Sequence, residues 1–254
     1  MGALEVYRYE RKFVVTATAA LAIRDFVRAY LVPDDHMAAD APAGYRVCSL
    51  YFDTPQFALY RQSTDGVKNR YKLRIRFYDS DPAGPAFLEI KRRTTDTIHK
   101  LRAVVRKSAA ERLLDGGRPS YAELLSNSDT SLRAIDEFCD CCQRLHAEPT
   151  TFVTFWREAF VSNSAEGVRA TLDRQIVGHA YCRGDRLAVP DRSTSAVERG
   201  VVLELKYNGR APRWMHDLIT CFSLQRQSFP KYVRCVDSVG GATRQMAFHG
   251  SSCG

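Results

Sequence analysis

The segment NRYKLRIRFY, residues 69–78, places a basic side chain at every second position. In an extended chain, Lys72, Arg74 and Arg76 point to one side, and the apolar residues between them point to the other. This period of two predicts a β-strand with one charged face and one apolar face. The apolar face must pack in a core, so the sheet carries its basic face on the opposite side.

The same alternation recurs along the chain. Its charged positions are Arg8, Glu10 and Lys12, then Glu89, Lys91 and Arg93, then Lys100 and Arg102, and finally Glu204 and Lys206. A single such lysine is explained by a solvated outer face, but five strands that share the pattern favour an inward-facing interpretation. Like charges that face each other on paired strands repel. We therefore expect an anionic ligand, with a triphosphate or a longer phosphate chain as the best fit.

About eight strands with short connections predict an antiparallel sheet, and eight strands are enough to close a barrel. The predicted fold class is α+β, a closed eight-stranded antiparallel β tunnel with flanking helices. Helices are expected from Thr16 or Thr18 to about Leu31, between residues 108 and 146, and after Pro212. We expect one domain over residues 1–239 and a disordered tail over residues 240–254.

Composition and sequence features indicate which ligands and which cellular location suit the protein. The 254 residues carry 37 Lys and Arg against 29 Asp and Glu, a net charge of +8 that suits an acidic ligand. No apolar stretch is long enough for a membrane span and no signal peptide is evident, which predicts a cytoplasmic protein but leaves a membrane partner open. The eight scattered cysteines are expected to be reduced thiols. Nucleic acid is disfavoured because the aromatic residues alternate to the face opposite the charges.

The charged residue types indicate two kinds of ligand. Arginines offer forked donors for phosphate, and lysines act as compact charges. Carboxylates among them, at Glu10, Glu89 and Glu204, suggest Mg²⁺ or Mn²⁺ held together with substrate phosphates. The alternative is that each glutamate pairs with a neighbouring Lys or Arg. Arg157 is a further phosphate-ligand candidate, although a lone arginine among aromatics also suits a stacking role.

Nine short motifs, read in order, resemble the VTC domain of polyphosphate polymerases, which belong to the triphosphate tunnel metalloenzymes. They are YERKF, SLYFDT, NRYKLRIRFY, FLEIKRR, the region around Lys100, FWREAF, TLDR, LELKYN and FPKYV. The resemblance covers residue 5 to about residue 237. It implies an eight-stranded tunnel that transfers the γ-phosphate of ATP onto inorganic polyphosphate with Mn²⁺ or a similar ion.

Site residues follow from the resemblance and from the alternation. By motif, the phosphate contacts are Lys12, Arg74, Arg76, Lys91, Lys100, Arg157 and Lys231, with Glu204 as metal ligand and Tyr232 as support for the Lys231 segment. By pattern alone, the tunnel lining also includes Glu10, Lys72, Glu89, Arg102, Asp173 and Lys206, and Glu89 is a second candidate metal ligand.

The chain departs from the family pattern at two positions. Arg8 stands where the related triphosphatase and cyclase branch has the first Glu of its Glu-x-Glu-x-Lys signature, which favours the VTC branch. Pro230 stands where the family often has Ser, so up to two phosphate donors are missing. Two alternatives therefore remain: a metal-dependent hydrolase of tripolyphosphate or nucleoside triphosphates, and a non-catalytic sensor of polyphosphate or inositol phosphate.

Overall fold

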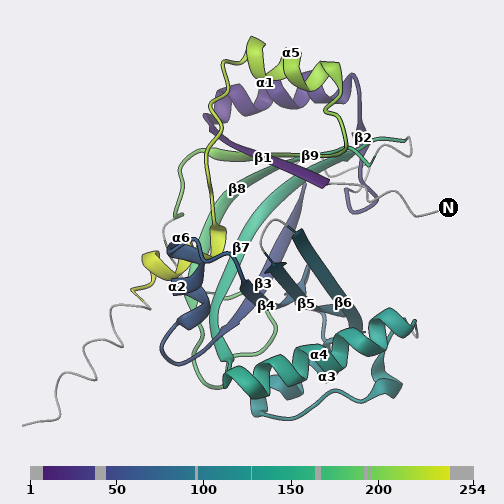
Figure 1. Ribbon diagram of the computed structural model, residues 1–254, viewed down its shortest axis with the longest axis vertical. Coiled ribbons are helices and arrows are strands. Elements are labelled where there is room, and N and C mark those ends of the chain that lie inside the picture. Colours follow the sequence, from purple (N-terminus) through teal and green to yellow (C-terminus); the bar gives the residue numbers. More distant parts are fainter. Residues whose placement is uncertain are drawn as a thin grey trace, which may run out of the picture. The chain divides into compact units, whose positions relative to one another are not determined.

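A computed structural model describes residues 8–37, 44–94, 97–126, 128–163, 167–191, 194 and 196–240 (Figure 1). The strands are β1 (Arg8–Val15), β2 (Val32–Pro33), β3 (Tyr45–Asp53), β4 (Arg70–Phe77), β5 (Pro85–Thr94), β6 (Thr97–Arg106), β7 (Glu148–Val161), β8 (Arg169–Ala180) and β9 (Val201–Asn208). The helices are α1 (Ala17–Arg28), α2 (Ala58–Thr64), α3 (Lys107–Glu111), α4 (Asp129–Leu145), α5 (Arg213–Cys221) and α6 (Lys231–Ser238). Short 3-10 turns cover Arg112–Asp115 and Tyr121–Glu123. Most of the expected tail, and the Thr95–Asp96 turn, lie outside the described residues.

One sheet contains all the strands, in the order β1-β9-β8-β7-β3-β4-β5-β6, and the two-residue β2 pairs with β7. Antiparallel registers join β1 to β9, β8 to β9, β3 to β4, β4 to β5 and β5 to β6. The predicted α+β class, with a mainly antiparallel sheet and flanking helices, is confirmed. The sheet path holds the eight strands expected, with β2 as an addition.

Closure of the sheet differs from the expectation. Within the described residues the strand order is a path with two ends, β1 and β6, and not a ring. The outer edge of β1 is partly occupied by the segment that follows α5, because the backbone N–H of Gln227 donates to the carbonyl of Lys12 at 3.0 Å. A strand edge that receives a loop in this way has part of its hydrogen-bonding capacity satisfied without a strand partner.

The chain forms two compact units, and β3, β7 and β8 contribute residues to both. Unit 1 comprises residues 1–46, 155–176 and 198–229. Its core lies where α1 and α5 cover the apolar face of β1 and β9 (Figure 1), with Phe13, Ile23, Leu203 and Leu218 at most 1% exposed. The side chain of Thr16 accepts from the N–H of Ala19 and caps α1, as the sequence predicted.

Unit 2 comprises residues 47–154, 177–197 and 230–254. Its core joins the apolar faces of β3 to β6 with α4, through residues such as Leu73, Leu88 and Phe138, none of them exposed to solvent. Helix α4 lies along β5 and β6, and α2 lies beside α6 (Figure 1). No helix in the described part of the chain is both long and apolar enough to span a bilayer. The seven described cysteines are free thiols.

Gly178 of β8 allows α6 to approach the sheet closely. A Cβ at this position would lie 2.7 Å from the Cβ of Cys235 and 2.8 Å from its carbonyl oxygen. We expect Gly178→Ala to destabilise the protein by about 1–3 kcal/mol, because overpacking shifts α6 away from β8. Thermal denaturation should show the loss, and alkylation of the buried Cys235 thiol should become faster. The equally buried Cys48 serves as the control, and unchanged protection of Cys235 would contradict this account of the packing.

Candidate functional site

Unit 2 brings the alternating basic residues onto one face of β4, β5 and β6. The strand registers place Lys72 opposite Lys91 and Lys91 opposite Lys100, so that three lysines share one rung of the sheet. The neighbouring rung aligns Arg74, Glu89 and Arg102 in the same way. The basic face is defined here by Arg70, Lys72, Arg74, Arg76, Glu89, Lys91, Arg93, Lys100 and Arg102. Glu89 is its one carboxylate among these described positions.

Glu89 binds cations through both carboxylate oxygens. Its Oε2 accepts from Nε and Nη2 of Arg74 at 2.7 and 2.6 Å. Its Oε1 accepts from Nε of Arg102 at 2.8 Å and lies 2.7 Å from Nζ of Lys100. Burial opposes ionisation of this 1% exposed side chain, but the cations, Arg74 foremost, outweigh it and hold the pKa of Glu89 well below its usual range. The ion-pair interpretation of Glu89 is therefore realised in the structure, and its role as a metal ligand stays a prediction.

The lysine rung concentrates positive charge beside this network. Like charges on directly opposed positions destabilise a sheet, and three such positions meet at Lys72, Lys91 and Lys100. Partial burial lowers the pKa of Lys100 to about 8, and the charges of Arg102 and Arg74 act in the same direction against Glu89. Glu89 opposes this lowering, with its Oε1 2.7 Å from Nζ of Lys100, so loss of hydration is the main cause of the shift.

A chain of aromatic and polar contacts fixes Arg74 from the other side. Its Nη1 donates to the hydroxyl of Tyr51 at 2.9 Å, and the Tyr51 ring stacks on Tyr232 with centroids 4.5 Å apart. Tyr232 in turn donates to Oδ2 of the fully buried Asp53 at 2.7 Å. Lys231, the first residue of α6, is thereby anchored through its neighbour. The expected support of the Lys231 segment by Tyr232 has a physical basis in these contacts.

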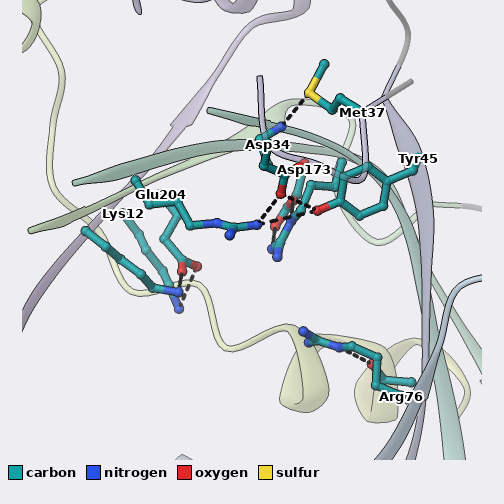
Figure 2. A network of polar contacts seen from close by, with 12 residues as sticks. Lys12, Asp34, Met37, Tyr45, Arg76, Asp173 and Glu204 are labelled. Carbon is teal, nitrogen blue, oxygen red and sulfur yellow. Dashed lines mark hydrogen bonds and ion pairs between the residues drawn. The ribbon is translucent and has the colours of Figure 1, made fainter. Parts of the chain in front are cut away.

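Unit 1 contains a second charged group, the carboxylate–lysine cluster of Glu10, Lys12, Glu204 and Lys206. Strand pairing places Glu10 opposite Lys206 and Lys12 opposite Glu204. Nζ of Lys12 lies 3.7 Å from Glu204 Oε2 (Figure 2). It also lies 2.8 Å from Glu10 Oε1, and Lys206 pairs with Glu204 as well. Burial opposes the charge on Lys12, but Glu204 and Glu10 raise its pKa above the ordinary value.

This cluster suits a divalent cation better than the basic face does. Glu10 and Glu204 present two carboxylates from adjacent strands, and Mg²⁺ or Mn²⁺ commonly takes one or two protein carboxylates together with phosphate oxygens. The described residues contain no group of three or more His, Cys, Asp or Glu that would form an all-protein metal cage. The donor set is thus compatible with a metal that also binds the substrate.

Arg157 lies in unit 1 and forms a forked ion pair. Its Nε and Nη2 donate to the two carboxylate oxygens of Asp173 at 2.7 and 2.8 Å. Its guanidinium also lies 5.1 Å from the centroid of the Phe155 ring. Burial opposes the charge, but Asp173 and, more weakly, Glu204 raise the pKa of Arg157. The sequence suggested both a phosphate ligand and a stacking residue, and the structure contains the stacking contact together with a carboxylate partner.

Sequence reasoning missed a third polar group in unit 1. Asp34, only 5% exposed, accepts from the hydroxyl of Tyr45 at 3.1 Å and from Nη2 of Arg169 at 2.7 Å (Figure 2). These residues come from three distant segments and share no motif, so no local signal indicates the contact. Arg70 and Arg93 were also left out of the expected site residues, although Arg93 was part of the alternation and one further step along β4 reaches Arg70.

The expected site residues thus fall into two groups. Unit 1 holds Glu10, Lys12, Arg157, Asp173, Glu204 and Lys206, and unit 2 holds Lys72, Arg74, Arg76, Glu89, Lys91, Lys100, Arg102, Lys231 and Tyr232. Within each unit the strand registers bring most of these residues onto shared rungs. Their roles toward a ligand remain predictions.

Comparison with known proteins gives a family. The family model described as VTC domain matches residues 7–239. No curated protein matches the chain. The structure of the PH1819 protein from Pyrococcus horikoshii OT3 is 13% identical, with 89% of this chain and 98% of that chain covered and a TM-score of 0.43. The putative adenylyl cyclase HpAC1 from Hippeastrum, described as revealing a dominant triphosphatase activity, is 16% identical, with 92% and 97% covered and a TM-score of 0.48.

Removal of the charge on Glu89 tests its role as the centre of the basic face. We expect Glu89→Gln to destabilise the protein by on the order of 3 kcal/mol, because the cations lose their shared counter-charge. Tripolyphosphate should then raise the melting temperature of the variant more than that of the wild-type protein. The exposed Glu148→Gln is the matched control. Equal shifts in melting temperature for Glu89→Gln and the wild-type protein would show that tripolyphosphate does not replace the carboxylate.

The lowered pKa of Lys100 gives a pH dependence. Lys100 is charged below about pH 8 and loses its proton above it, so the affinity of the wild-type protein for tripolyphosphate should fall as the pH rises from 7 to 9. Lys100→Arg keeps its charge over this range and should show a flatter profile. Isothermal titration calorimetry of both proteins provides the comparison, and parallel profiles would exclude Lys100 as the titrating group.

Proposed function

This chain belongs to the VTC domain family, and on that premise we propose that it is a polyphosphate polymerase that transfers the γ-phosphate of ATP to a growing polyphosphate chain. The observation that carries the proposal is the rung of Lys72, Lys91 and Lys100 beside the Arg74–Glu89–Arg102 rung. Adjacent strands lie about 4.8 Å apart, so the lysine rung carries a cationic residue on each of three neighbouring strands. A condensed phosphate, which is charged on every phosphoryl unit, matches such a row.

In this proposal the basic face holds phosphate groups in line. Arg74 and Arg102 are oriented by Glu89 through hydrogen bonds of 2.7 and 2.8 Å, so their remaining donors are fixed before a ligand arrives. Preorganised cations stabilise the charge that develops on the transferred phosphoryl group, and that is the main protein contribution to this class of reaction. No covalent enzyme intermediate is required.

The carboxylate–lysine cluster has the complementary role. Glu204 and Glu10 would hold Mn²⁺ or Mg²⁺. When bound, this metal ion would neutralise part of the negative charge of the phosphates. Lys12 and Lys206 now contact these carboxylates. A cation that takes over the carboxylate oxygens leaves both ammonium groups available to phosphate oxygens. Arg157 would be a further hydrogen-bond donor to phosphate. Its side chain is already held by two hydrogen bonds to Asp173, so it would lose little conformational entropy when a ligand binds.

Pro230 bears on the strength of phosphate binding near α6. It is the N-cap residue of that helix and makes no side-chain capping bond, and proline has no N–H to donate. Lys231, the next residue, therefore has to contact phosphate without help from this neighbour. This feature reduces the number of donors, but it leaves the Tyr232–Asp53 anchor of the segment intact.

The product of ATP turnover distinguishes polymerase from hydrolase. Purified protein incubated with ATP and Mn²⁺ should form long, acid-labile phosphate chains that are detected by gel electrophoresis. Glu204→Gln should reduce the rate by at least about 100-fold, because the divalent cation would lose a carboxylate ligand. Glu148→Gln, at an exposed position, should leave the rate unchanged. Release of orthophosphate alone would support the hydrolase, and binding without turnover would support the sensor.

A further inference from the structure

A surface pocket of unit 1 borders the carboxylate–lysine cluster and shares one residue with it, Glu10. Its volume is about 480 Å³, a size that holds a single small ligand. The arginine pocket is lined by Tyr9, Glu10, Arg11, Tyr207, Gly209, Arg210, Ala211, His216 and Arg226. These residues come from the start of β1, the end of β9, the turn before α5, α5 itself and the segment after it. The start of β1 thus meets the region from the end of β9 to the segment after α5 at one place.

An aromatic platform forms one wall of the arginine pocket. Tyr9 and Tyr207 are directly opposed on β1 and β9, and their rings stack with centroids 5.5 Å apart and an interplanar angle of 23°. Tyr207 is 5% exposed and Tyr9 is 48% exposed, so the buried ring supports the exposed one. The guanidinium of Arg11 lies 5.7 Å from the Tyr207 centroid. A rigid exposed ring of this kind offers a stacking surface for a second flat π-system.

Three cations also line the pocket. They are Arg11, Arg210 and Arg226, against one carboxylate in the lining, Glu10, and the last two arginines are exposed. Arg226 is held next to β1 because the adjacent Gln227 N–H donates to the Lys12 carbonyl at 3.0 Å. Arginines are suited to forked contacts with phosphate oxygens. The pocket therefore combines a stacking ring with phosphate-binding groups.

We propose that the arginine pocket binds a nucleoside diphosphate or triphosphate, with the base stacked on Tyr9 and the phosphates on Arg11, Arg210 and Arg226. An inorganic phosphate chain has no group for the aromatic wall. A longer nucleic acid has no continuous groove here, because the pocket has the volume of a single small ligand. The proposal does not depend on the polymerase assignment, since Tyr9 and Arg11 alternate with Glu10 and Lys12 along β1 and point to the other face of the strand.

Three probes separate the base from the phosphates: ADP, pyrophosphate and adenosine. They are titrated into the full chain without metal by isothermal titration calorimetry. We expect ADP to bind about tenfold more tightly than pyrophosphate, because a stacked base adds to the affinity, and adenosine to bind more weakly than ADP. Tyr9→Ala should reduce ADP affinity to the level of pyrophosphate. The double variant Arg210→Ala/Arg226→Ala should weaken ADP and pyrophosphate alike by at least about tenfold.

Two control variants match these substitutions. Tyr30 is also exposed and also stacked, on Trp214 with centroids 5.2 Å apart, and Arg28 is an exposed arginine of α1; neither lines the pocket. Tyr30→Ala and Arg28→Ala should leave ADP affinity unchanged.

Two results would overturn the proposal. One is equal affinity for ADP and pyrophosphate with no effect of Tyr9→Ala, and the other is undiminished ADP affinity of the double arginine variant. A failed polymerase assay leaves these binding results unaffected, so the two proposals fail separately.

Discussion

The buried carboxylate of Glu89 is the interaction on which the basic face depends. Arg74, Lys100 and Arg102 could not lie together on a sheet without it, because opposed like charges repel strongly where water is excluded. One carboxylate can order these groups but cannot neutralise eight cations, namely Arg70, Lys72, Arg74, Arg76, Lys91, Arg93, Lys100 and Arg102. Removal of this carboxylate would leave the three cations that it contacts without their shared counter-charge. A phosphate ligand of the kind proposed would compete with Glu89 for the same cations.

The carboxylate–lysine cluster in unit 1 also brings charged residues together on neighbouring strands, but it avoids the repulsion of like charges by pairing opposite charges. On β1 and β9, acidic and basic residues alternate so that each faces its opposite charge across the rung. Two lysines and two glutamates then satisfy one another, and the cluster needs no external counter-charge. A cation that binds there must displace ammonium groups and not water alone. In the proposed function, the affinities for metal and for phosphate would therefore be linked here, since phosphate would attract the displaced lysines.

The sequence predicted the charged faces well because a period of two depends only on local backbone geometry. It could not predict the register of the strands, and the rung of Lys72, Lys91 and Lys100 exists only in that register. Its prediction that Lys12, Glu204 and the residues of β4 to β6 share a site stays a prediction, since Lys12 and Glu204 belong to unit 1 and β4 to β6 belong to unit 2. The contact of Asp34 with Tyr45 and Arg169 was missed because it depends on tertiary packing of three segments. The open strand path was missed because strand count alone does not determine what occupies the edge of β1.

Strand β1 illustrates how one short segment can serve two chemistries. Its even positions, Glu10 and Lys12, join the cluster with Glu204, and its odd positions, Tyr9 and Arg11, line the arginine pocket. The pleat of the strand separates the two sets onto opposite faces, so a change in one set need not disturb the other. Glu10 is the exception, because it lies in the cluster and also borders the pocket. A phosphate bound by Arg11 would add negative charge near Glu10 and strengthen its hold on a cation. Glu10 is therefore one route by which a ligand in the pocket would affect the cluster, and the hydrogen bond from Gln227, the neighbour of Arg226, to the Lys12 carbonyl is another.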